Sequence, residues 1–291
     1  SASLSYEKAE EVSQELQMLP GMSRAGLERL TQPYAQACQQ ETRVLLEIAK
    51  DAPLLNEGAG RNVVIEVDGV RVLGQPQDGV CEGIEIKSAV IHYVSDPGKR
   101  SFLADVCEAS IFTEQVAGLM REAGLRQNDE IVGLSDGAEW IKNLFESLGI
   151  EHILDVYHSS SYLDTLMQTL GWSEAQRLQT RRAWLRGEVA ASEWLHLHVP
   201  DPSVWLAWDE PSQTALRYLE ERQQQMNYPS YKARGLPIGS GQVEGMHKSV
   251  IGYRMKQSGM HWSRSGAGRM AALRAWRCSK KPLVSHDTLR L

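Results

Sequence analysis

Three acidic residues of this chain stand where folding could build an oxygen-lined metal site. Asp68 ends the apolar run 63–67, and Asp136 ends a second apolar run, 131–134, and opens a helix. Glu244 lies far downstream, at the start of the only strongly basic stretch of the chain. Carboxylate oxygens are the ligands that Mg²⁺ prefers, and tertiary folding can bring strand ends and a helix start together. The chemistry expected of such a site is metal-assisted cutting of nucleic acid.

Each acid also has an explanation that needs no chemistry. Asp68 is followed by glycine, and Asp-Gly is a strong signal for a type I′ hairpin turn. Asp136 with Glu139 fits a helix capping box, and Glu244 with Lys248 forms a stabilising pair four residues apart. Taken singly, each residue favours the structural explanation. Taken together, their order and their setting at buried strands favour a site.

The helix expected around Glu244 distributes its side chains in an informative way. One face is expected to pack on a sheet, and it carries Val243, Met246 and Val250. The neighbouring face is free to meet a metal and a phosphate, and it carries Glu244, His247 and Lys248. The preceding loop, 239–241, has neither GxGxxG nor Walker spacing, so it is expected to turn tightly into the helix with Ser240 as N-cap.

Residues 62–155 follow the pattern of an α/β unit. The expected strands cover 63–67, 84–94, 101–106, 131–134 and 152–156, and the expected helices cover 111–123 and 138–148. Three strands in succession, followed by alternating helix and strand, predict a mixed five-stranded sheet with an antiparallel half and a parallel half. Helices are expected to flank it.

A helical N-terminal region is expected over residues 1–58. A turn at 19–22 separates an apolar helical stripe from a second helix that Ser23 caps. Helix, short turn and helix resemble a helix-turn-helix DNA-binding unit. A plain helical arm or a dimer contact would show the same pattern, so both alternatives stay open.

A second helical region is expected over residues 159–231. It contains five of the eight tryptophans, and tryptophan-rich helices usually form a core of their own. Gly171 and Gly187 stand where helices would end. The region therefore predicts an all-helical insertion, and residues 276–291 are expected to form a C-terminal tail.

Charge is distributed unevenly along the chain, whose net charge is −6. From Lys232 onward there are twelve basic residues and two acidic ones, so this segment carries +10 and the remainder −16. A polyanion-binding end on an acidic body has this distribution, and so does a tail that packs on its own acidic body.

Composition sets broad limits on compartment and size. The chain has 291 residues, enough for one or two domains, and no apolar run approaches the length of a membrane span. No signal peptide is visible, and the chain begins with Ser1, as a trimmed or partial chain would. The four cysteines show no CxxC spacing, which indicates free thiols in a reducing compartment.

Four stretches of the chain together resemble a known family. They are Val63–Val70, Gly133–Trp140, Ile153–His158 and Pro237–Glu244, the last continuing through Lys248, Gly252, Arg254 and Lys256 to Ser258–Ser263. In this order and spacing they resemble bacterial insertion-sequence transposases of the DDE type, most closely the Kra group. The resemblance spans about residues 60 to 275 and implies an RNase H-like catalytic domain, placed at 59–158 and 232–275 with the helical insertion between.

The resemblance also implies roles for individual residues. Asp68, Asp136 and Glu244 would be the catalytic triad and would bind two Mg²⁺ or Mn²⁺ ions. Asp155 and His158 would be auxiliary, and Asp155 is a rival for the second aspartate. The residues expected to contact nucleic acid are His247, Lys248, Arg254, Lys256, His261, Trp262 and Arg264. The implied partners are transposon-end and target DNA, bound by a homodimer on paired ends in a bacterial cytoplasm, at the nucleoid and away from membranes.

Two other classes of function remain as alternatives. A catalytically inactive, transposase-derived DNA-binding protein would share the motifs and the basic segment. A hydrolase of another class, such as a glycosidase, could use Asp68 and Asp136 as paired carboxylates but would leave the basic segment unexplained. A serine hydrolase is not favoured, because the chain has no Gly-x-Ser-x-Gly motif.

Overall fold

The computed structural model describes residues 24–51, 54–55, 58, 60–76, 78, 80–199 and 201–279. The chain forms two compact units: unit 1 comprises Ser1–Glu130 and Gly241–Leu291, and unit 2 comprises Ile131–Ser240. The turn expected at 19–22 and most of the expected tail lie outside the described residues. The domain boundaries expected from the sequence, with an insertion at 159–231, remain a prediction.

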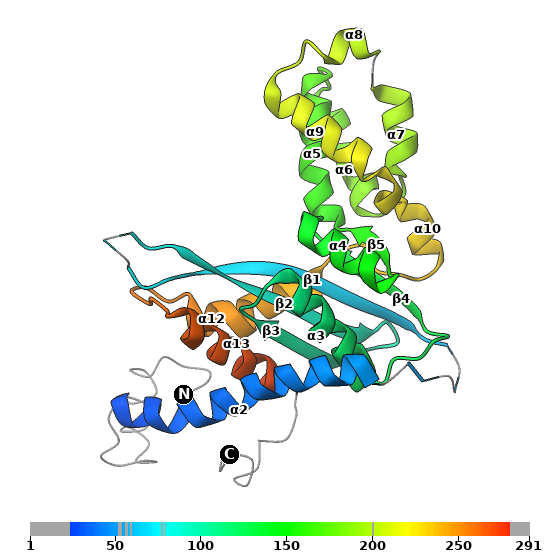
Figure 1. Ribbon diagram of the computed structural model, residues 1–291. Helices are drawn as coiled ribbons and strands as arrows, with labels where there is room; N and C mark the ends of the chain where they lie inside the picture. Colours follow the sequence, from blue (N-terminus) through cyan, green and yellow to red (C-terminus); the bar gives the residue numbers. More distant parts are fainter. Residues whose placement is uncertain are drawn as a thin grey trace. The chain divides into compact units, whose positions relative to one another are not determined.

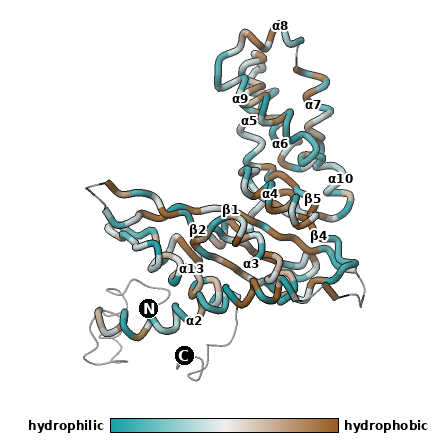
Figure 2. Tube along the Cα trace, in the orientation of Figure 1, coloured by the Kyte–Doolittle hydropathy of each residue, from teal (hydrophilic) through white to brown (hydrophobic). Residues whose placement is uncertain are grey.

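Unit 1 contains three antiparallel strands, β1 (Asn62–Leu73), β2 (Gly83–Tyr93) and β3 (Asp96–Asp105). They form a meander in which β2 pairs with both neighbours. The long apolar runs of β1 and β2 are expected of strands that are covered on both faces, and Figure 2 shows them in brown. The three strands expected in succession are therefore present.

Helices cover the two faces of this meander, as Figure 1 shows. On one face Tyr93 donates from its hydroxyl to the carbonyl of Ala123, at the end of α3 (Ala109–Glu122). On the other face lie α11 (Gly241–Met246), the π-helix η2 (His247–Gly252), α12 (Tyr253–Met255) and α13 (Arg264–Cys278). The long helix α2 (Arg24–Asp51) packs against both α3 and α13.

The expected amphipathic helix after Gly241 is confirmed by its burial pattern. The side chains that were expected to pack on the sheet are 1–2% exposed: Val243, Met246 and Val250. They join a core with Val70 and Val72 of β1 and Ile86 and Val90 of β2. Burying these aliphatic side chains favours folding by roughly 1.5–3 kcal/mol each, which fixes α11 and η2 on this face.

The hairpin turn expected at Asp68 and Gly69 is absent. Strand β1 continues to Leu73, and within it Asp68 pairs with Ser88 and Gly69 pairs with Lys87. Asp-Gly is a local turn signal, whereas the strand is held by pairing over its whole length with β2. Asp68 therefore lies inside a paired strand and not at its end.

Unit 2 begins with a strand, a helix and a parallel strand. These are β4 (Glu130–Ser135), α4 (Glu139–Leu148) and β5 (Glu151–Leu154), and β4 pairs with β5 in parallel. Helix α4 buries Ile141, Leu144 and Phe145, as its 3.6-residue period predicts. The described strands thus include antiparallel and parallel pairs flanked by helices, which confirms a mixed α/β class.

The rest of unit 2 is helical. Its elements are α5 (Val156–Thr169), α6 (Glu174–Leu185), α7 (Ala191–His198), α8 (Pro202–Trp205), α9 (Glu210–Glu221), the 3₁₀ helix η1 (Gln223–Met226) and α10 (Tyr228–Ala233). Gly171 and Gly187 follow the ends of α5 and α6 with positive φ, as expected. Trp184 is fully buried, and its indole N–H donates to Ser159. In the described part of the chain, no helix is long and apolar enough to cross a membrane.

His152 on β5 predicts a pH dependence of stability in unit 2. Its ring lies 2.8 Å from Ser135 Oγ, and burial, aided by the positive charges of Arg222 and Lys142, lowers its pKa to about 4. The unfolded chain binds this proton near pH 6.5, so the folded state loses stability as the pH falls from about 6.5 toward 4.

The expected loss between pH 7 and pH 5 is about 2 kcal/mol, measured by urea unfolding. Tryptophan fluorescence suits this measurement, because unit 2 holds six of the eight tryptophans. The variant His152→Gln, which cannot titrate, should show a smaller change over the same range. An equal change in both proteins would contradict this account.

Candidate carboxylate site

Both oxygens of the Asp68 carboxylate have close protein neighbours. Oδ1 accepts from the backbone N–H of Gly69 at 2.6 Å, and Oδ2 lies 3.0 Å from Nδ1 of His247. Its side chain is 29% exposed, so solvent still reaches it. The strand thus presents one oriented and accessible carboxylate beneath the π-helix.

His247 lies between Asp68 and a buried serine. Its Nε2 atom is 2.5 Å from Oγ of Ser88, which also lies 3.1 Å from the carbonyl oxygen of Asp68. Serine, histidine and aspartate in line resemble the relay of a serine hydrolase. Ser88 is fully buried, however, so its hydroxyl cannot reach a substrate. The line is therefore a support for Asp68 and not a nucleophile.

Glu66 lies two residues before Asp68, on the same face of β1. It is 1% exposed, and its two oxygens contact Nε2 of His92 at 3.0 Å and the backbone N–H of Val243 at 2.7 Å. A buried carboxylate needs such partners, because an unpaired one would cost several kcal/mol. Glu66 therefore fixes the first turn of the helix that carries Glu244.

Glu244 is the exposed member of the expected triad. It lies in the first turn of α11, and Oε1 accepts from Nζ of Lys248 at 2.7 Å. Both side chains are more than 60% exposed, so this pair contributes little to stability. The expected pairing four residues apart is confirmed, and the carboxylate of Glu244 remains open to solvent.

Asp136 lies in unit 2, after strand β4. Its Oδ1 accepts from the backbone N–H of Ala138 at 3.1 Å. Helix α4 begins at Glu139 with Ala138 as N-cap, and no side chain caps it. The expected capping box of Asp136 and Glu139 is therefore wrong: Gly137 adopts φ 87°, which places the helix start two residues later.

Asp155 and His158 lie near each other at the start of α5. Asp155 is the N-cap, with Oδ1 accepting from the backbone N–H of His158 at 2.7 Å. Its Oδ2 accepts from both the backbone N–H and the hydroxyl of Ser240, at 2.6 and 2.7 Å. The hydroxyl of Ser240, expected to cap the next helix, is used here instead. Asp155 thus has a full structural role.

Tyr218 of α9 contacts the backbone of Asp136 and the ring of His158. Its hydroxyl donates to the carbonyl oxygen of Asp136 at 2.8 Å, and its ring lies 5.9 Å from that of His158. The ring of Tyr162 stacks on the ring of Tyr218, with 3.8 Å between their centroids, and the guanidinium of Arg222 lies over the ring of Tyr218. Burial raises the pKa of Tyr218 well above its ordinary value, so it stays a hydrogen-bond donor.

Asp155 and Asp136 should differ in their contribution to stability. Asp155→Ala removes a helix cap and both bonds to Ser240, so we expect the free energy of unfolding to fall by about 2 kcal/mol. Asp136→Asn keeps its acceptor for Ala138 and should change stability by less than about 0.5 kcal/mol. Urea unfolding followed by tryptophan fluorescence measures both. Equal losses would contradict the structural role given to Asp155.

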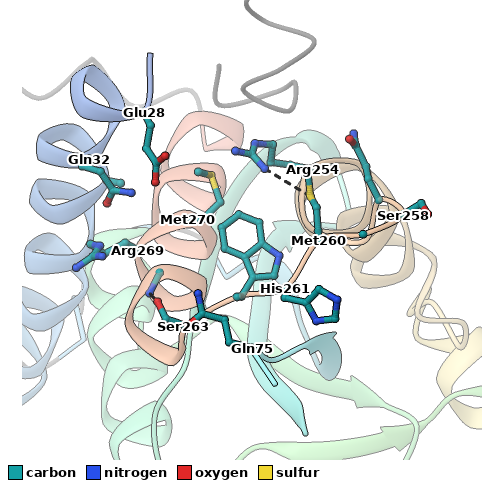
Figure 3. Close-up of a pocket in the computed structure, with 15 residues that line it drawn as sticks. Glu28, Gln32, Gln75, Arg254, Ser258, Met260, His261, Ser263, Arg269 and Met270 are labelled. Carbon is teal, nitrogen blue, oxygen red and sulfur yellow. Dashed lines mark hydrogen bonds between the residues drawn. The ribbon is translucent and has the colours of Figure 1, made fainter. Parts of the chain in front are cut away.

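Several residues expected to bind nucleic acid line one pocket of unit 1. The pocket has a volume of about 420 Å³ and lies between α2, α13 and the segment 257–263 (Figure 3). Its lining includes Arg254, His261 and Trp262, together with Glu28 and Arg269. Nε of Arg269 is buried without a hydrogen-bond partner. The lining therefore carries two guanidinium groups and one carboxylate.

The basic residues of the C-terminal part of unit 1 differ in how much surface they offer. Lys256, His261 and Arg264 are exposed. Arg254 is only 1% exposed, with its guanidinium 5.3 Å from the ring of Trp262. Arg274 is also buried: its Nε donates to the carbonyl of Val250, and burial lowers its pKa. These two guanidinium groups support the fold and have little surface for a phosphate.

The acids have the chemistry that Mg²⁺ or Mn²⁺ requires, because carboxylates are hard oxygen donors. Asp68 and Glu244 lie in unit 1, whereas Asp136 and Asp155 lie in unit 2. Within the described residues, no group of three or more His, Cys, Asp or Glu side chains is gathered so as to hold a metal ion. The donor set therefore fits the expected ions in kind, and the triad remains a prediction.

The sequence did not single out Ser88, Glu66, His92 or Tyr218. Strand alternation places Glu66 on the same face as Asp68, so Glu66 could have been predicted to lie near the site. Its position within an apolar run makes this easy to overlook. The partners of these residues are 20 or more positions away. Such contacts follow from tertiary packing, which no local pattern describes.

Comparison with known proteins adds little to this geometry. No family model and no curated protein matches the chain. Among solved structures, the chain is similar to that titled "Drosophila P element transposase strand transfer complex", at 10% sequence identity and a TM-score of 0.29. The match covers 94% of this chain and 86% of that chain. Because this TM-score is low, the fold and the site are described from the residues of this chain alone.

Proposed function

We propose that this chain is a DNA transposase of the DDE type, with an RNase H-like catalytic domain that cleaves and joins DNA strands. Asp68, Asp136 and Glu244 would be the metal-binding carboxylates. The observation that carries the proposal is the oriented, solvent-accessible carboxylate of Asp68 on a buried strand, in contact with His247, which follows the helix that bears Glu244. The resemblance of the motifs to insertion-sequence transposases supplies the reaction.

The residues of unit 1 suit work on a phosphodiester. When bound, two Mg²⁺ or Mn²⁺ ions would activate the attacking water or 3′-hydroxyl and stabilise the leaving oxygen. Asp68 and Glu244 supply negative oxygens, and Lys248, next to Glu244, supplies a cation for charge that develops at phosphorus. The exposed cations Lys256 and Arg264 would hold the DNA backbone with little sequence information.

The proposal extends to partners and location. Transposon-end and target DNA would be the substrates, and a homodimer on paired ends would bring two ends together. A bacterial cytoplasm, at the nucleoid, is the compartment in which such a protein would act.

Incubation with supercoiled plasmid DNA tests the proposal. We expect nicking in Mg²⁺ or Mn²⁺ that EDTA abolishes. Affinity for DNA should fall at least roughly tenfold between about 50 and about 200 mM salt, because even two released counterions have this effect. Cleavage that is unchanged in EDTA, or an affinity that does not respond to salt, would contradict the proposal.

A catalytically inactive DNA-binding protein is the second candidate. It is favoured by the engagement of both Asp68 oxygens with protein donors and by the scattered acids of the described residues. Salt-dependent DNA binding without any metal-dependent nicking would identify this candidate.

A further inference from the structure

We propose that His247 is a positioning residue that fixes the carboxylate of Asp68, and that Ser88 in turn fixes His247. The cleavage readout of this inference rests on the proposed function. The hydrogen-bond readout does not, because it concerns only the three side chains and their protons.

The three side chains come from three different elements that pack on one another. Asp68 lies on β1, Ser88 is its direct partner on β2, and His247 is the first residue of η2. The contacts are 3.0 Å from Nδ1 to Oδ2 of Asp68 and 2.5 Å from Nε2 to Oγ of Ser88. The side chain of His247 is 13% exposed, so little water competes for these contacts.

The carboxylate determines where the proton of His247 lies. Asp68 can only accept, so Nδ1 must carry a hydrogen; an Nδ1 lone pair would face an anionic oxygen at 3.0 Å. The hydroxyl of Ser88 can pair with Nε2 whether or not Nε2 carries a hydrogen. Its hydroxyl donates to a neutral ring, or accepts from a charged one and donates to the carbonyl of Asp68. Every arrangement that satisfies the three groups has the proton on Nδ1.

The same contacts restrict the rotation of the Asp68 side chain. Oδ1 accepts from the N–H of Gly69 and Oδ2 lies 3.0 Å from Nδ1 of His247, so rotation would give up both contacts. Each carboxylate oxygen has a second lone pair that these donors leave available. A bound metal ion would thus meet a carboxylate that is already oriented and would not have to immobilise it. Residues that support a metal-binding side chain have this effect.

Nitrogen NMR of the full chain, labelled on histidine, tests the proton position. We expect the ring signals of His247, identified by their loss in His247→Asn, to show a protonated Nδ1. A neutral ring that is protonated at Nε2 alone would overturn the proposal.

Two substitutions separate the roles of the two ring nitrogens. Asn places its amide nitrogen close to Nδ1, whereas Gln places it close to Nε2. His247→Gln should lose the donor to Asp68 and weaken Mn²⁺ binding by about 10- to 100-fold, as support residues do. His247→Asn should fall between Gln and wild type in both Mn²⁺ affinity and plasmid nicking. His196→Gln, on the exposed surface of α7, is the matched control.

The outcomes distinguish this inference from the proposed function. If wild type neither binds Mn²⁺ nor nicks DNA, the proposed function is wrong. The position of the proton on His247, measured by NMR, then still tests whether His247 is fixed against Asp68. If wild type is active but His247→Gln equals it in Mn²⁺ affinity and nicking, the positioning role is wrong. Should His247→Gln not fold, Ser88→Ala replaces it, with an expected loss of Mn²⁺ affinity that is smaller but measurable; no loss would overturn the role of Ser88.

Discussion

Replacement of Asp68 by Asn is expected to lower metal-dependent DNA nicking by on the order of 10³-fold while leaving DNA affinity within about twofold. Asn keeps the size of the side chain and one acceptor oxygen, but it removes the negative charge that a divalent ion needs. DNA affinity is expected to depend on the basic surface, which the substitution does not change. Nicking rates on supercoiled plasmid and a filter-binding titration measure the two quantities.

Glu82→Gln is the matched control for this substitution. It removes one negative charge from an exposed position next to β2 in the same unit and should leave nicking unchanged. Full activity in Asp68→Asn would show that the assignment of the carboxylate is wrong. Loss of DNA binding together with nicking would show that Asp68 supports the fold and not the chemistry.

Replacement of Glu66 by Ala is expected to lower the free energy of unfolding by about 3–5 kcal/mol. Glu66 is buried and holds two groups, Nε2 of His92 and the N–H of Val243. Its removal leaves both without their acceptor in a dry interior, and it opens a space next to β1. Because Val243 lies in the first turn of α11, nicking should fall as well. Urea unfolding followed by circular dichroism measures the loss of stability.

Glu66→Gln isolates the contribution of the charge. An amide oxygen can still accept from Val243, and the amide N–H₂ can donate to His92, so the loss should be about 1 kcal/mol. Glu82→Ala, on the surface, should change stability by less than about 0.5 kcal/mol. A loss below about 1 kcal/mol in Glu66→Ala would mean that Glu66 does not fix the start of α11.

Periodicity predicted most of the elements, because burial imposes it directly on the sequence. The apolar spacing of Ile141, Leu144 and Phe145 predicted helix α4, and the apolar run at 131–134 predicted β4 within a few residues, whereas β1 continues well past its expected end at 67. Local turn chemistry failed at Asp68, where Asp-Gly lies inside a strand. Pairing along eleven positions of β1 with β2 outweighs the preference of two residues, and this pairing depends on residues about 20 positions away.

The candidate site was less predictable than the elements. A rotation of 100° per residue predicted that Glu244, His247 and Lys248 share one helical face. It did not predict that His247 would contact Asp68 and Ser88. That contact requires the register of β1 with β2 and the position of η2 above both. Likewise, the charge of Arg254 predicted a surface role, whereas its burial makes it part of the core.

The π-helix η2 has a consequence for how its two ends can vary. A continuous α-helix advances 100° per residue, so a change of rotation at one end appears at the other. A π-turn closes hydrogen bonds over five residues and inserts extra backbone within one turn. The π-turn therefore offsets the rotational phase of Arg254 and Met255 in α12 from the phase that a continuous α-helix beginning at Glu244 would give them. With this offset, the same helical run directs His247 to the carboxylate of Asp68 and buries Arg254 and Met255 in the core.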